Sequence, residues 1–244
     1  LWHYATKEPT EMAAAMGFFE RAIQLDPGFA MGHAALALAL ATNAVRFRPF
    51  AERQALTDRA AEHARRSISL DPSDAFGHSA LALALMLLGR HEEAIAEAEL
   101  AVSLDPNSAR AYGYQGATRA FGGRPGEAIE PLLTALRLSP FDPLKANWLH
   151  HLGRAYYGIG DYPAAVATAR QLCQSFPDYQ AAYLTLIAGL GQTGHATEGQ
   201  RVMAEAIERF GEDFRVRFGR RPPDVRVDDH AHFLDGCRKA GVLD

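Results

Sequence analysis

The sequence predicts an all-α protein, a right-handed α-solenoid of helical hairpins that ends in a C-terminal capping helix. Its composition favours helix, because alanine is abundant, β-branched residues are scarce before the C-terminal tail, and alanine loses no side-chain entropy on entering a helix. Prolines recur with a period of 34 positions, at Pro72, Pro106 and Pro140. A fixed period of this length indicates stacked supersecondary units.

Two further sets of residues keep the register of these prolines. An alanine stands twelve positions before the proline that ends each repeat: Ala15, Ala60, Ala94, Ala128 and Ala165. A glycine stands seventeen positions before the end of each later repeat: Gly89, Gly123, Gly160 and Gly194. We expect the alanines where two helices cross closely, because a larger side chain would overpack that contact. We expect the glycines to end the first helix of each hairpin in a left-handed conformation.

These residues place the elements in order along the chain. We expect a partial repeat at residues 1–29 with one helix near 11–25, then full repeats near 30–72, 75–106, 109–140, 146–177 and 180–211. Asp74 and Ser108 stand just ahead of expected helices and are predicted N-caps. The first full repeat is 11 residues longer than the period (45 positions from Pro27 to Pro72 against 34), and we place this insertion at residues 45–53.

A tail is expected to follow the solenoid of residues 1–211 and to occupy residues 212–244. The Arg-Arg-Pro-Pro run at residues 220–223 predicts a break, and a closing helix is expected over residues 229–240 with Gly241 as its stop. Such a helix covers the apolar interface that an open solenoid exposes at its end. A cluster of basic residues in this tail is interpreted as solvated: Arg215, Arg217, Arg220, Arg221 and Arg226.

Charge and cysteine content exclude several classes of function. The formal net charge of -4 and the pI near 6.2 give no basic footprint for nucleic acid. Cys173 and Cys237 make neither a disulfide framework nor a metal-ligand pattern, which favours a cytoplasmic setting. No apolar run reaches the roughly 20 residues that span a bilayer, and the first residues show no signal-peptide pattern. Because the chain begins with Leu1 rather than methionine, we expect it to be part of a longer protein.

The repeat pattern resembles the tetratricopeptide (TPR) repeat family across roughly residues 11–211. A narrower resemblance rests on residues 1–4 (LWHY), 19–30 (FERAIQLDPGFA) and 234–243 (LDGCRKAGVL). These segments are similar to the C-terminal TPR region of bacterial class III adenylate/guanylate cyclases and of winged-helix transcriptional regulators, although Cys237 stands where that family has leucine. The resemblance implies a regulatory or partner-binding module. It carries no cyclase activity, because the cyclase's metal-binding aspartates and its α/β domain are absent.

Motifs that suggest chemistry have simpler structural interpretations here. Residues 189–194 match G-x-G-x-x-G, but they fall at the end of an expected helix and not between a strand and a helix, as a nucleotide site requires. The adjacent His150 and His151 point about 100° apart on a helix, which is poor for sharing a metal ion. No nucleophile motif or desolvated pair of carboxylates stands out. We therefore expect no cofactor, no metal and no catalytic residue, and any catalysis to reside in a missing upstream domain.

A partner-binding groove is the expected functional site. Resemblance to the TPR family implies that the first helix of each hairpin lines a concave wall, and its register selects ten residues: Phe76, Met86, Arg110, Tyr114, Phe121, Asn147, His150, His151, Arg154 and Tyr157. Aromatic and arginine side chains are common anchors of binding energy. Four of these residues are expected to receive an acidic group or a C-terminal carboxylate: Arg110, Asn147, His150 and Arg154. The lysine and asparagine clamp of chaperone-binding relatives is missing.

The sequence therefore predicts a non-catalytic protein–protein interaction module, the regulatory part of a bacterial signalling protein. Its expected partner is a protein or peptide in the groove, with no direct contact to nucleic acid or membrane. Two alternatives stay open at this point. One is a sensor of a small ligand or peptide, and the other is a homo-oligomerisation platform built on the apolar insertion at residues 45–53.

Overall fold

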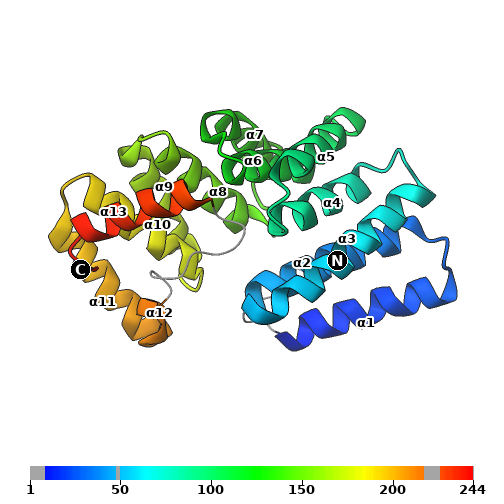
Figure 1. Ribbon diagram of the computed structural model, residues 1–244, viewed down its shortest axis with the longest axis horizontal. Coiled ribbons are helices and arrows are strands. Elements are labelled where there is room, and N and C mark those ends of the chain that lie inside the picture. The colour runs from blue at the N-terminus through cyan, green and yellow to red at the C-terminus, as the bar shows by residue number, and fades with distance from the viewer. Residues whose placement is uncertain (1–8, 48–49, 217–225, 244) are drawn as a thin grey trace. The chain divides into compact units, whose positions relative to one another are not determined.

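The computed structural model describes residues 9–47, 50–216 and 226–243. These residues form α-helices joined by short turns and contain no strand (Figure 1), so the predicted all-α fold is confirmed. The contacts between residues divide the chain into two units, Leu1–Thr118 and Arg119–Asp244, and each is described by itself. Three sequence predictions lie outside the described residues: the resemblance at residues 1–4, the break at residues 220–223, and the basic side chains of Arg217, Arg220 and Arg221.

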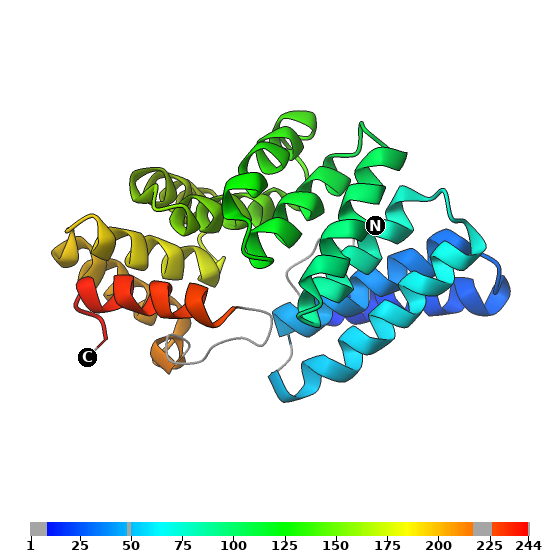
Figure 2. The same ribbon diagram turned by 45° about the horizontal axis from the view of Figure 1, so that its top comes forward.

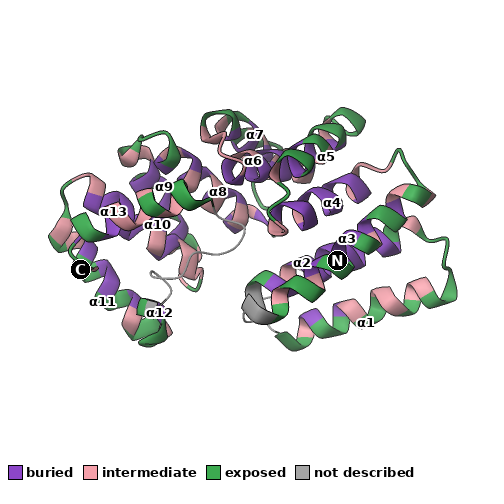
Figure 3. Ribbon diagram, in the orientation of Figure 1, coloured by how far each residue is buried: buried purple, intermediate pink, exposed green. Residues whose placement is uncertain are grey.

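Unit 1 is a series of antiparallel helices, and each of the first four packs against the next along the chain. Its helices are α1 (Pro9–Leu25), α2 (Ala30–Phe47), α3 (Phe50–Leu70), α4 (Ala75–Leu87), α5 (His91–Leu104) and α6 (Ala109–Phe121), the last residues of which fall in unit 2. Both α2 and α4 are apolar on nearly all sides, because each lies between neighbours on several faces. The outer helix α1 buries only Met12 and Ala15 and shows mostly exposed and intermediate residues (Figure 3).

The insertion in the first full repeat lengthens both helices of its hairpin. Helix α2 has 18 residues and α3 has 21, whereas the following pair, α4 and α5, have 13 and 14. The extra residues that we placed at residues 45–53 are thus added mainly as helix on both sides of residues 48–49. The side chains of residues 46–51 lie outside the described part of the structure.

Unit 2 continues the same plan with α7 (Pro125–Leu138), α8 (Lys145–Gly158), α9 (Tyr162–Ser175), α10 (Gln180–Gln192) and α11 (Ala196–Phe210). The short α12 (Asp213–Val216) packs on α11, and the closing helix α13 (Val227–Lys239) packs against α10 (Figure 2). The closing helix begins two residues before the expected position 229. The core of unit 2 contains large side chains with at most 2% exposure: Trp148, Leu172, Tyr183 and Ile187.

The turns are formed as the repeat pattern predicts. Gly89, Gly123, Gly160 and Gly194 all have φ between 73° and 81°. At the first of these turns the N–H of Arg90 donates to the Leu85 carbonyl at 2.9 Å and that of Gly89 to Met86 at 3.0 Å, the bonding pattern of a glycine-terminated helix. The alanines at the hairpin crossings are fully buried, as Ala94, Ala128 and Ala165 illustrate with 0% exposure.

Both predicted N-caps are confirmed. The carboxylate of Asp74 accepts a hydrogen bond from the N–H of Phe76 at 2.9 Å, and the hydroxyl of Ser108 accepts one from Ala111 at 3.2 Å. Each satisfies a backbone donor that the first turn of a helix leaves unpaired. Helix positions, and with them the faces that the first helices present, are therefore set by local residues.

Candidate protein-interaction surface

The predicted groove residues of unit 2 gather around α8. Five of them lie in one continuous cluster together with Tyr179, and this α8 cluster consists of Phe121, Asn147, His150, His151, Arg154 and Tyr179. Phe121 closes α6, Tyr179 lies in the turn before α10, and the other four project from α8. Residues from three parts of the chain thus form one surface.

The cluster is held together by ring contacts. The Arg154 guanidinium carbon lies 4.4 Å from the centroid of the Phe121 ring, the geometry of a cation–π contact. The Phe121 ring meets the His151 ring edge-on, with 5.7 Å between the ring centroids. The centroids of the His150 and His151 rings lie 5.2 Å apart. Arg154 is therefore seated on an aromatic floor.

Tyr179 closes the other side of the cluster. Its ring centroid is 5.6 Å from that of His150, and its hydroxyl donates to the Asn147 side-chain oxygen at 3.2 Å. The repeat register did not predict this residue, because it selects positions on the first helices only. An aromatic residue two positions after the repeat-ending Pro177 was the signal available.

Both histidines of the α8 cluster are electrically neutral at pH 7. Burial lowers the pKa of His151 to about 3, and the neighbouring Arg154 charge contributes to this shift. Burial likewise holds the pKa of His150 well below its usual range, with His151 and Arg154 adding to the effect. Although both residues are partly exposed, both Nδ1 atoms are shielded and have no hydrogen-bond partner among the described residues. Among these residues, Arg154 carries the positive charge.

Unit 1 has a smaller surface of the same kind. The Arg110 guanidinium carbon lies 4.7 Å from the centroid of the Phe76 ring, and both side chains are partly exposed. The other two predicted groove residues of this unit are packed inside, since Met86 is 3% exposed and Tyr114 is 8% exposed. Of the four predicted groove residues in unit 1, Phe76 and Arg110 are therefore the two that a partner can contact.

Tyr157 is covered by the closing helix. Its side chain is 7% exposed, its hydroxyl donates to the backbone oxygen of His232 at 2.9 Å, and its ring lies 4.6 Å from the His232 ring. Phe121 is also buried, at 7%. Of the ten predicted groove residues, six present accessible surface: Phe76, Arg110, Asn147, His150, His151 and Arg154.

The G-x-G-x-x-G run at residues 189–194 has a packing role. Gly189 and Gly191 lie inside α10, and Gly194 ends the turn with φ 77°. A Cβ on Gly191 would overlap the Gly236 carbonyl oxygen of α13, and one on Gly189 would lie 2.8 Å from Val166. These glycines allow helices to approach closely, and they follow helix rather than strand.

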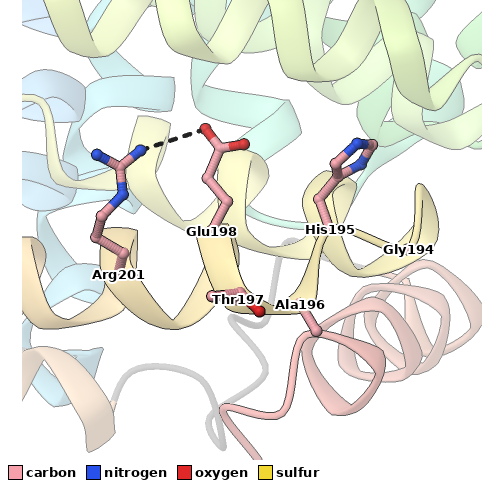
Figure 4. Close-up of a pocket in the computed structure, with 6 residues that line it drawn as sticks. All are labelled: Gly194, His195, Ala196, Thr197, Glu198 and Arg201. Atoms are coloured by element: carbon pink, nitrogen blue, oxygen red, sulfur yellow. Dashed lines mark ion pairs between the residues drawn. The ribbon is translucent and has the colours of Figure 1, made fainter.

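A shallow hollow of about 510 Å³ lies at the start of α11 and is lined by Gly194, His195, Ala196, Thr197, Glu198 and Arg201. The Glu198 carboxylate is paired with Arg170 at 2.7 Å. It is also paired with Arg201 at 3.6 Å, as Figure 4 shows. The hollow thus holds a surface ion-pair network. Within the described part of the chain, no group of three histidine, cysteine, aspartate or glutamate side chains is placed to hold a metal ion.

Helical hairpins with glycine turns, small residues at the crossings and aromatic side chains on the first helices define a helical-repeat protein. Two segments, residues 75–108 and residues 149–179, match family models described as tetratricopeptide repeat. Tetratricopeptide repeats are protein-interaction modules. The comparison with curated proteins finds no match.

Solved structures show the same fold at low sequence identity. YrrB, described as a TPR protein with an unusual peptide-binding site, matches with a TM-score of 0.53 and 15% identity over 80% of this chain and 93% of that one. PilF of Pseudomonas aeruginosa matches with a TM-score of 0.58 and 18% identity over 85% and 90%. The Cut9–Hcn1 hetero-tetramer of the APC/C matches with a TM-score of 0.70 and 14% identity over 93% of this chain and 40% of that chain.

None of the helices in the described ranges combines the length and the apolar character needed to cross a membrane.

Proposed function

We propose that this chain is a non-catalytic protein-interaction module whose α8 cluster receives an acidic peptide or a C-terminal carboxylate. The observation that carries this proposal is the seating of Arg154 on the Phe121 ring, 4.4 Å from its centroid, beside two neutral histidines. A guanidinium on an aromatic face keeps the planar fork of N–H donors that matches a carboxylate. Arginine and aromatic side chains of this kind dominate binding energy at interfaces.

The neutral histidines define the kind of ligand that fits. Because burial keeps the pKa values of His150 and His151 low, they supply ring surface and not charge. A ligand with one carboxylate and adjacent apolar groups matches one guanidinium surrounded by rings. Each further carboxylate of a more acidic ligand would face the uncharged rings of His150 and His151, so the α8 cluster favours contact with a single carboxylate.

The setting that we propose is the regulatory region of a bacterial signalling protein in the cytoplasm, downstream of a cyclase or winged-helix domain. It is supported by the resemblance of residues 19–30 and 234–243 to such regions. The reading frame upstream of Leu1 tests it directly. A domain of either kind would support the setting, and an unrelated domain would argue against it.

Peptide binding to the purified chain tests the α8 cluster. We would array peptides with acidic side chains and free C-terminal carboxylates, and repeat each with an amidated C-terminus. Arg154→Glu is expected to weaken the best binders at least about tenfold, the scale of a lost charge-assisted hydrogen bond plus repulsion. Arg137→Glu, which changes an exposed arginine on α7, is the matched control. Equal binding by the Arg154→Glu and parent chains would overturn the assignment.

A further inference from the structure

The closing helix α13 lies on the side of unit 2 where the first helices end. It packs against α10 (Figures 1 and 2), and its His232 meets tyrosines of two other helices. The Tyr157 hydroxyl of α8 donates to the His232 carbonyl at 2.9 Å, and the Tyr162 hydroxyl of α9 is 2.9 Å from His232 Nε2. One surface, spread over three repeat helices, therefore receives α13.

Backbones approach closely at the centre of this contact. A Cβ added to Gly236 would collide with the Tyr157 hydroxyl and lie 2.6 Å from the Ala188 carbonyl oxygen, and one added to Gly191 would overlap the Gly236 carbonyl. A glycine on each helix is needed for this approach, because any larger side chain would push the helices apart. The surface therefore selects a helix with glycine at this position.

A polar contact fixes the register of α13. The Gln192 side-chain amide donates to Asp235 at 2.9 Å, and its oxygen accepts from Lys239 at 2.8 Å. Asp235 and Lys239 also pair with each other at 2.7 Å, one turn apart on α13. The Gln192 side chain thus forms hydrogen bonds with an acidic and a basic residue that stand four positions apart on α13.

The buried apolar part of the contact is small. Helix α13 buries Gly236 and Cys237, and Ala240 at its C-cap is also fully buried, whereas the repeat helix α11, which also packs on α10, buries four residues that include Val202 and Met203. Phe233 and Leu234 remain partly exposed. Since stability follows buried apolar area and the fully buried residues of α13 are small, α13 is expected to separate from unit 2 more easily than the outer repeat helix α11.

We propose that this surface, the helix seat of Tyr157, Tyr162, Ala188, Gly191 and Gln192, is a binding site for a helix of a partner protein, and that α13 occupies it in cis. The partner helix carries the chemistry that α13 displays: an acidic residue, glycine directly after it, a basic residue four positions after the acid, and alanine four positions after the glycine. This inference extends the proposed interaction function, but it does not involve Arg154.

Cys237 provides the test, because its side chain projects from α13 and is 0% exposed, so its thiol reacts only when α13 leaves the seat. In the full chain with Cys173→Ser, we would measure thiol labelling while adding a peptide of residues 227–243 with Cys237→Ala. The peptide traps the open state, so the labelling rate is expected to rise with its concentration, by about fivefold or more near 1 mM. The same peptide with Gly236→Leu should leave the rate unchanged. A rate independent of the first peptide would overturn the proposal.

Direct binding gives a second measurement. Gly236→Leu in the full chain should unseat α13 and bind the labelled peptide of residues 227–243 about tenfold more tightly than the parent, because the internal competitor is gone. Circular dichroism of this variant would check that it is folded. Equal affinities of the two chains would count against the helix seat. Arg154→Glu should leave this binding unchanged, so its outcome is separate from that of the α8 cluster.

Discussion

The Nδ1 atoms of His33 on α2 and His63 on α3 lie 3.0 Å apart, and the two rings, 5.2 Å between centroids, join the longest pair of helices among the described residues. One nitrogen must donate and the other accept, so the contact requires at least one neutral ring. Burial lowers the pKa of both histidines. His33 also feels the Arg66 charge, and His63 feels His33 and Arg59.

Stability is expected to fall as the solution is acidified below about pH 6.5. The four histidines His33, His63, His150 and His151 have folded-state pKa values below the unfolded value of 6.5, so the unfolded chain binds more protons in this range. For His151, with a pKa near 3, the slope approaches about 1.4 kcal/mol per pH unit between those two values.

Urea denaturation at pH 7.5, 6 and 5 measures this effect. His63→Phe removes one titrating ring and should flatten the dependence between pH 7.5 and 5. A free energy of unfolding that stays constant or rises on acidification would contradict this prediction.

Replacement of Ala165 by leucine should destabilise unit 2. Ala165 is 0% exposed at the α8–α9 crossing, and overpacking a tight contact costs about 1–3 kcal/mol. Ala167→Leu on the exposed face of the same helix adds the same side chain and should change stability by less than about 0.5 kcal/mol. Thermal unfolding followed by circular dichroism compares the two, and equal shifts would argue against a close crossing.

Replacing a repeat glycine with a left-handed backbone conformation should lower the stability of the fold. Gly160 has φ 81°, and a Cβ at this position would meet no other group within 4 Å, so Gly160→Ala loses about 1 kcal/mol through backbone conformation alone. Gly17 lies inside α1 and also has open space where a Cβ would stand, and Gly17→Ala should gain about 0.5–1 kcal/mol. Thermal unfolding of both variants measures the two effects, and shifts of the same sign would count against the left-handed turn.

The aromatic floor of the α8 cluster should contribute to peptide affinity. Phe121→Leu keeps an apolar side chain but removes the ring beneath Arg154, and cation–π contacts are worth about 0.5–2 kcal/mol. The acidic peptides selected by the array should therefore bind Phe121→Leu about three- to tenfold more weakly. Because Phe121 is 7% exposed, helical content and unfolding temperature must be recorded beside the affinity. Unchanged affinity in a folded variant would remove Phe121 from the site.

The features that the sequence predicted best are those that depend on local backbone chemistry. Gly89 and its equivalents take positive φ because no side chain opposes it, and Asp74 caps α4 through its own neighbour Phe76. These contacts involve residues a few positions apart, so the repeat register alone was enough to place the helices. The same register brought most of the α8 cluster together.

The features that were missed depend on contacts between distant residues. The seat of α13 on α10 needs Gly191 and Gly236 to meet across 45 positions of sequence (236 less 191). The pattern placed one at the end of an expected helix and the other in the expected closing helix, and it gave no sign that they meet. Neutral His150 and His151 follow from their burial, which no repeat position specifies. The closing helix itself was predicted, but Tyr157, the α8 residue that it covers, was predicted to contact a partner.

The long α2–α3 hairpin has a steric consequence. At 1.5 Å per residue, the 18 and 21 residues of α2 and α3 exceed the 13 and 14 of α4 and α5 by roughly 8–10 Å of rod. The hairpin therefore projects beyond its neighbour inside unit 1 and forms an overhang at that edge. This overhang adds helical surface to the α2–α3 hairpin that the shorter α4–α5 hairpin does not have.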